Sequence, residues 1–74
     1  MVHGLIGTHI ATGQVVEIPL NIKETLLGVD VNPETMNISW DMLCDSVEHR
    51  TGITIQGEIE IDTFVRDGLH FPFH

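Results

Sequence analysis

The sequence predicts a single small α+β domain over residues 1–74, in which a small antiparallel sheet packs against one amphipathic helix at about 40–50. Three observations predict this class. The N-terminal part has the pattern of a β-hairpin, residues 40–50 carry the apolar stripe of a helix, and residues 53–61 alternate between apolar and polar side chains. We therefore expect a sheet that contains the first hairpin and the strand 53–61, with the helix on one face.

The N-terminal hairpin is expected at residues 2–20. A three-residue loop that ends at Gly13 would place this glycine in the left-handed conformation that such loops require. With this loop Ile6 faces Ile18, and both apolar rows fall on one face of the hairpin. A two-residue loop would scatter the apolar residues, so the pattern favours the longer loop.

The segment after the hairpin has two features. Asn21 and Glu24 have the spacing of a capping box, which predicts one short helical turn that ends at Gly28. Residues 29–38 suit a second hairpin, because apolar residues alternate on both sides of an Asn-Pro turn. The same Asn-Pro pair could instead cap and begin a longer helix. The alternation favours the hairpin, with the longer helix as the alternative.

Residues 40–50 have the capping and the periodicity of a helix that faces a core. Ser39 is expected at the N-cap, and Gly52 is expected as the left-handed residue that ends the helix. Apolar side chains at positions i, i+3, i+4 and i+7 form one stripe, which consists of Trp40, Leu43, Cys44 and Val47. This stripe predicts the face of the helix that packs on the sheet.

Cysteine content and hydropathy bear on the cellular compartment. Cys44 is the only cysteine, so no internal disulfide can form and a reduced, cytoplasmic location is expected. Asp41 and Asp45 lie beside it and would raise its pKa, so we interpret it as a core residue and not as a nucleophile. No apolar run approaches the roughly 20 residues of a membrane span, and no signal peptide is recognisable.

Acidic side chains form two groups that we take as candidate binding residues. In the predicted strand 53–61 the polar positions end in carboxylates that project from one face, and a second acidic stripe follows one side of the helix. The candidate binding residues are Glu58, Glu60, Asp62, Asp41, Asp45 and Glu48. A solvated surface is the first interpretation, a docking face for a basic partner is the second, and a catalytic carboxylate pair is the third.

The formal net charge of −8 disfavours several functions. An acidic surface repels phosphate backbones and anionic lipid, so we expect no direct nucleic-acid binding and no membrane binding. The five histidines lack the spacing of a metal site, and the chain has no phosphate-binding loop and no nucleophile elbow. We therefore predict no metal, no cofactor and no catalytic residues, and enzyme activity is disfavoured.

The C-terminal residues 69–74 form an apolar arm after an Asp-Gly turn. A chain of 74 residues buries only about 60% of the surface that its unfolded form exposes, so self-association would stabilise it. We expect a homo-oligomer in which Leu69, Phe71 and Phe73 contact a neighbouring subunit. Packing of the arm on its own core is the rival interpretation.

Size, acidity and the lack of catalytic motifs favour a protein that acts by binding. We expect a small acidic protein–protein interaction module, such as an inhibitor, an adaptor or an assembly subunit of viral or mobile-element type, that occupies a basic or strand-presenting surface. The alternative is a homo-oligomer that binds or sequesters a small ligand or nucleotide in pockets between subunits. Anionic ligands would require Lys23, Arg50 or Arg66 to cluster there. A minimal enzyme or metal protein is the third class.

Overall fold

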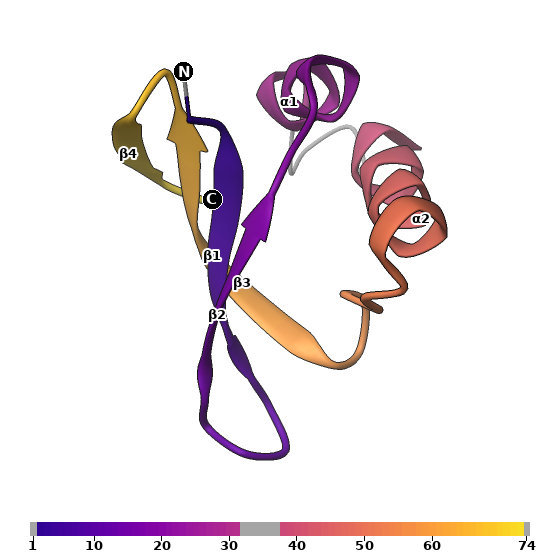
Figure 1. Cartoon of the computed structure of the whole chain (residues 1–74), viewed down its shortest axis with the longest axis vertical. Coiled ribbons are helices and arrows are strands. Elements are labelled where there is room, and N and C mark those ends of the chain that lie inside the picture. The colour runs from indigo at the N-terminus through magenta and orange to yellow at the C-terminus, as the bar shows by residue number, and fades with distance from the viewer. Residues whose placement is uncertain (1, 32–37, 74) are drawn as a thin grey trace.

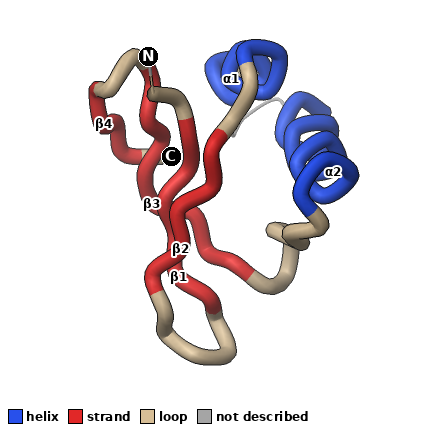
Figure 2. Tube along the Cα trace, in the orientation of Figure 1, coloured by secondary structure: helices blue, strands red, loops and turns tan. Residues whose placement is uncertain are grey.

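A computed structural model describes residues 2–31 and 38–73. Its elements, in chain order, are β1 (Gly4–His9), β2 (Val15–Pro19), α1 (Ile22–Val29), α2 (Ile38–Thr51), β3 (Ile59–Arg66) and β4 (Leu69–Pro72). The four strands form one sheet of order β2-β1-β3-β4, in which every neighbouring pair is antiparallel. Both helices lie on one side of this sheet (Figures 1 and 2). The predicted α+β class, with a small antiparallel sheet and a helix on one face, is confirmed.

Strands β1 and β2 form the predicted hairpin, but in a different register. Leu5 lies opposite Ile18, a position that we had predicted for Ile6. The loop comprises residues 10–13 and is one residue longer than predicted. The backbone N–H of His9, just before the loop, donates to the carbonyl oxygen of Gln14, just after it, and this bond closes the loop. Gly13 has the predicted left-handed conformation, with a φ of 73°. The longer loop exchanges the two faces of β1, so Leu5 is buried in the core and Ile6 faces the other way.

Helix α1 begins with the predicted capping box. The side chain of Asn21 accepts a hydrogen bond from the backbone N–H of Glu24 at 2.8 Å, and the Glu24 carboxylate accepts one from the backbone N–H of Asn21 at 3.2 Å. The helix does not end at Gly28 but continues to Val29. A Cβ at Gly28 would lie 2.9 Å from the ring of Phe64, so close packing on β3, and not helix termination, requires this glycine.

The predicted second hairpin at 29–38 is wrong at both of its described ends. Val29 is the last residue of α1, and Ile38 already belongs to α2. The predicted turn at 32–35 and the start of the second predicted strand, 36–37, lie outside the described residues. Short apolar runs fit a strand and a helix end equally well, which explains the error. Helix α2 includes the predicted 40–50, but Ser39 lies inside the helix and is not its N-cap.

The strand predicted at 53–61 starts later, as β3. Gly52 has a φ of 79° and ends α2 as predicted. The chain then makes a turn in which Gly57 has a φ of 80° and the backbone N–H of Ile59 donates to the carbonyl oxygen of Ile55 at 2.9 Å. Ile55 is buried although it precedes the strand. The alternation therefore identified buried residues on both sides of this turn, but not the residue at which pairing begins.

The core lies between the sheet and the two helices. Its buried members come from β1, β2, α2, β3 and the loops and include Leu5, Ile18, Leu43, Cys44, Val47, Ile59 and Ile61, and Leu27 of α1 is partly buried against them. Burial, followed by the nearby Asp41 and Asp45, raises the pKa of the Cys44 thiol to about 12. The thiol is thus protonated at neutral pH. The prediction that Cys44 is a core residue is confirmed.

A bulge interrupts the pairing of β1 with β3. Ile6 lies opposite Thr63 and Gly7 lies opposite Ile61, so Asp62 has no partner in β1. A Cβ at Gly7 would lie 2.5 Å from the carbonyl oxygen of Glu60, which explains the need for glycine at this point. The bulge sets which residues of β3 face the helices.

Candidate functional site

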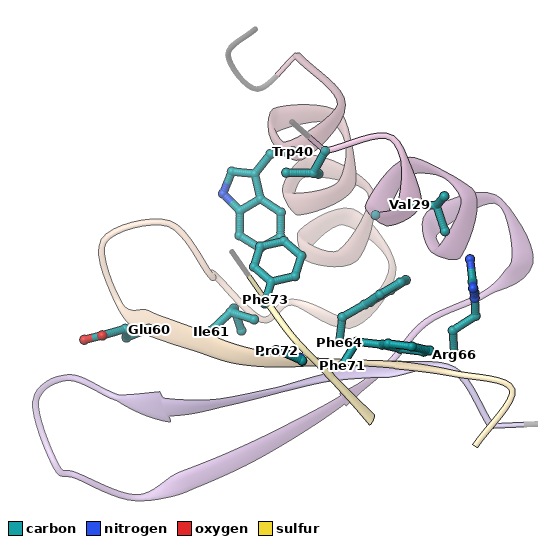
Figure 3. A pocket seen from close by; sticks show the side chains of 11 residues that line it. Val29, Trp40, Glu60, Ile61, Phe64, Arg66, Phe71, Pro72 and Phe73 are labelled. Atoms are coloured by element: carbon teal, nitrogen blue, oxygen red, sulfur yellow. The ribbon is translucent and has the colours of Figure 1, made fainter. Parts of the chain in front are cut away.

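A hollow of about 520 Å³ lies between the helices and the C-terminal half of the sheet. The end of α1, the start of α2 and the strands β3 and β4 form its walls (Figure 3). All four aromatic side chains of the chain line it, namely Trp40, Phe64, Phe71 and Phe73. We refer to it as the aromatic hollow.

Three of these rings are in contact with one another. The ring centroids of Trp40 and Phe73 lie 5.0 Å apart at an interplanar angle of 43°, and Phe64 meets Phe73 edge-on at 6.3 Å. These separations lie in the range that aromatic pairs prefer. Phe73, predicted as an oligomer contact, therefore packs on its own chain. Leu69 and Phe71 are 62% and 37% exposed, and self-association through them stays a prediction.

The β3–β4 turn brings the C-terminal aromatic residues to this place. Asp67 and Gly68 have φ values of 54° and 78°, as the two central residues of a tight hairpin turn require, so the predicted Asp-Gly turn is confirmed. The turn folds residues 69–72 back as β4, with Phe71 directly opposite Phe64. The apolar arm is thus an edge strand of the sheet, and Phe71 shares a face with a core residue.

A positive side chain, Arg66, lies beside the rings of the aromatic hollow. The Arg66 guanidinium carbon lies 5.5 Å from the centroid of the Phe71 ring, a cation–π contact. Arg66 forms no ion pair with any residue in the described part of the chain. Glu60 also borders the hollow, but its carboxylate points away from the rings, whereas the Arg66 side chain extends beside Phe64 toward Val29 (Figure 3).

The other face of the sheet is not covered by any element in the described ranges (Figure 1). The strand registers place Ile6 opposite Glu17, and Thr8 opposite both Val15 and Glu60. Val15 is 67% exposed, and neither carboxylate forms an ion pair with a described residue. We refer to this surface as the uncovered face, and it includes Ile6, Thr8, Val15, Glu17, Glu60 and Thr63.

The carboxylates predicted on one strand face are separated in the structure. Glu60 lies on the uncovered face, in β3. Glu58 lies in the turn before β3, where its Oε2 is 3.8 Å from Nε2 of His9. Asp62 is the bulge residue and accepts a hydrogen bond from Oγ1 of Thr63 at 2.9 Å. The expected row of three carboxylates therefore does not form, because a turn precedes it and a bulge interrupts it.

The three acidic residues predicted on the helix share one side of α2. Oδ1 of Asp41 accepts a hydrogen bond from Nε2 of Gln56 at 2.7 Å, and Oε2 of Glu48 accepts one from Oγ1 of Thr54 at 2.6 Å. Asp45 lies between them and is exposed. Two of the three thus attach the helix to the loop before β3, which gives this stripe a structural role.

A buried ionic cluster, absent from the sequence predictions, joins α1, α2 and β2. The Glu24 side chain is 0% exposed. Its Oε1 accepts a hydrogen bond from Nη2 of Arg50 at 2.6 Å, and its Oε2 accepts bonds from Oγ of Ser46 at 2.5 Å and from Nε of Arg50 at 3.2 Å. Nη2 of Arg50 also donates to the carbonyl oxygen of Pro19 at 2.8 Å. Both oxygens of this carboxylate accept hydrogen bonds from within the fold.

The ionisation of Glu24 follows from these contacts. Burial alone would raise the pKa of Glu24, but the hydrogen bonds from Arg50, Ser46 and the backbone of Asn21 hold it below its ordinary value. The carboxylate is therefore charged at neutral pH and is a structural anchor. Because Arg50 is committed to it, only Arg66 of the three cations Lys23, Arg50 and Arg66 lies at the aromatic hollow.

Among residues 2–31 and 38–73, no three His, Cys, Asp or Glu side chains lie together as metal ligands would. None of the helices in these ranges has the length and apolar character needed to cross a membrane. No protein-family model, curated protein or solved structure matches the chain. The aromatic hollow and the uncovered face are therefore the features that bear on function.

Proposed function

We propose that this protein is a small acidic interaction module that acts by binding a protein partner with a basic surface, as an inhibitor, adaptor or assembly subunit does. The observation that carries the proposal is the uncovered face, where Glu17 and Glu60 lack ionic partners among the described residues and lie beside Ile6 and Val15. Apolar area bordered by charge is the composition of a protein-binding surface.

Charge determines the kind of partner that this surface fits. A second copy packed on the same face would bring Glu17 and Glu60 close to like charges, in a chain whose net charge is already −8. Lysine and arginine side chains of a different protein would instead be complementary to both carboxylates. We therefore favour a basic protein partner over self-association on this face.

The sheet edges support docking on the face and disfavour pairing with a strand of the partner. The two edge strands, β2 and β4, each end in a proline, Pro19 and Pro72. Proline has no backbone N–H to donate to an added strand, and prolines on edge strands commonly prevent such pairing. The carbonyl oxygen of Pro19 is in addition occupied by Arg50. The partner is therefore expected to contact side chains of the face.

The charge of the uncovered face provides the first test. The partner would be isolated by co-purification with the wild-type chain from cells in which the protein is native. Replacing both face carboxylates, Glu17→Lys and Glu60→Lys, should slow association with this partner by about tenfold or more and weaken its salt dependence, because charges at an interface steer encounter. The measurement is surface plasmon resonance at low and high salt.

The matched control changes the net charge equally at a different place. Asp30→Lys with Asp45→Lys alters two exposed carboxylates on the helices and should leave association within about twofold of the wild type. Equal slowing by both double variants would show that only net charge matters. Association rates that Glu17→Lys with Glu60→Lys leaves unchanged would refute docking on this surface.

A further inference from the structure

We propose that the aromatic hollow is a second, separate binding site that takes a planar aromatic molecule carrying one carboxylate. The site lies on the helix side of the sheet, and the uncovered face lies on the other side (Figures 1 and 3). Glu60 alone borders both, and its carboxylate points away from the rings, so ligand binding in the hollow does not rest on the proposed function.

The size and lining of the aromatic hollow define the body of the ligand. A volume of about 520 Å³ falls within the range of pockets for small molecules. Trp40, Phe64, Phe71 and Phe73 supply ring faces and edges, against which flat π-systems pack in offset or edge-on geometries. Gly28 contributes no side chain at the α1 wall, where a Cβ would already lie 2.9 Å from the ring of Phe64. This lining fits a fused or substituted aromatic ring.

The charge beside these rings defines the polar group of the ligand. Arg66 is exposed, lies over Phe71, and has no carboxylate partner among the residues that the structure describes. Its planar guanidinium can donate two parallel hydrogen bonds to one carboxylate. Aromatic rings also attract cations, but the cation position beside Phe71 is occupied by Arg66 itself, and the Glu60 carboxylate points away (Figure 3). The geometry therefore favours an anionic group over a cationic one.

The test uses three naphthalene probes that differ in charge, namely 2-naphthoate, the neutral 2-naphthamide and (2-naphthyl)trimethylammonium. Trp40 is the only tryptophan, so its indole N–H gives one assignable cross-peak in a ¹H–¹⁵N spectrum of the full-length chain. We expect 2-naphthoate to shift this peak with a Kd on the order of 1 mM or tighter, given the affinity that a ligand of this size reaches. 2-Naphthamide should bind about tenfold more weakly, since it lacks the charge that strengthens hydrogen bonds from a guanidinium.

Variants separate Arg66 from the general charge of the protein. Arg66→Gln should weaken 2-naphthoate about tenfold and 2-naphthamide by less than about twofold, because only the carboxylate forms charge-assisted hydrogen bonds with the guanidinium. Lys23→Gln removes the same charge at the start of α1, away from the hollow, and should change neither affinity. Thermal unfolding of both variants shows whether they remain folded.

The comparison of the three probes on the wild-type chain does not depend on any variant. Equal affinity for 2-naphthoate and 2-naphthamide, tighter binding of the trimethylammonium probe, or no shift of the Trp40 peak at several millimolar would each overturn the proposal. Binding of 2-naphthoate that Arg66→Gln leaves intact would also overturn it.

Discussion

Ile59→Asp is expected to unfold the protein, whereas Glu58→Lys, one residue earlier, is expected to leave it folded. Ile59 is buried in the core and pairs with His9 of β1, so an aspartate there would place an unpaired carboxylate in an apolar layer. That change costs several kcal/mol, on the order of the whole stability of a chain of this length. Circular dichroism during thermal and urea unfolding measures both effects.

Glu58 is the matched control because it lies next to Ile59 but outside the core. It is exposed, and its distance of 3.8 Å from His9 indicates at most a weak surface ion pair. Glu58→Lys should therefore change the free energy of unfolding by no more than about 0.5 kcal/mol. Similar melting temperatures for the two variants would contradict the assignment of faces at the start of β3.

Arg50→Ala is expected to have the next largest effect on stability. It leaves the buried Glu24 carboxylate without its counter-charge and removes the bond to Pro19. Breaking a buried pair in this way costs about 3 kcal/mol. The Arg50 side chain is 36% exposed, so water reaches the site and the loss of stability should be smaller than this. Urea unfolding at neutral pH measures the loss, and His49→Ala, at an exposed neighbour, is the control.

The pH dependence of this loss distinguishes the ionic cluster from simple packing. In the wild type the pKa of Glu24 is lowered in the folded state, so its contribution to stability is present above the unfolded-state pKa and is lost as pH falls through the folded-state pKa. In Arg50→Ala, burial without a counter-charge favours the protonated form of Glu24. The difference in the free energy of unfolding between wild type and variant should therefore shrink on acidification. A difference that is constant with pH would mean that Arg50 acts by packing alone.

The sequence predicted those parts of the fold that local patterns specify. Periodicity identified Leu43, Cys44 and Val47 as the core-facing stripe of α2, and the Asn21–Glu24 spacing identified the start of α1. The register of the first hairpin was not predictable, because Leu5 and Ile6 are adjacent apolar residues and either could face the core. Tertiary pairing with β3 decides between them.

Little of the candidate sites could be predicted, because they combine residues that are distant in sequence. Trp40 and Phe73 meet only after the β3–β4 turn folds the C-terminus back onto the sheet, and Glu24 and Arg50 meet only when the two helices pack. No spacing rule connects such pairs. Of the predicted acidic residues, Glu60 lies on the uncovered face, but its companion Glu17 is on a different strand and was not selected.

The most direct test of the proposed function is a map of the partner's contacts on the folded chain. In ¹H–¹⁵N spectra of the full-length protein with increasing amounts of the co-purified partner, we expect the largest changes at the amides of Ile6, Thr8, Val15 and Thr63, which belong to the uncovered face. Amides on the exposed side of α2, such as that of Asp45, should change little. Changes confined to α2 or to the aromatic hollow, with the uncovered face unaffected, would contradict the account.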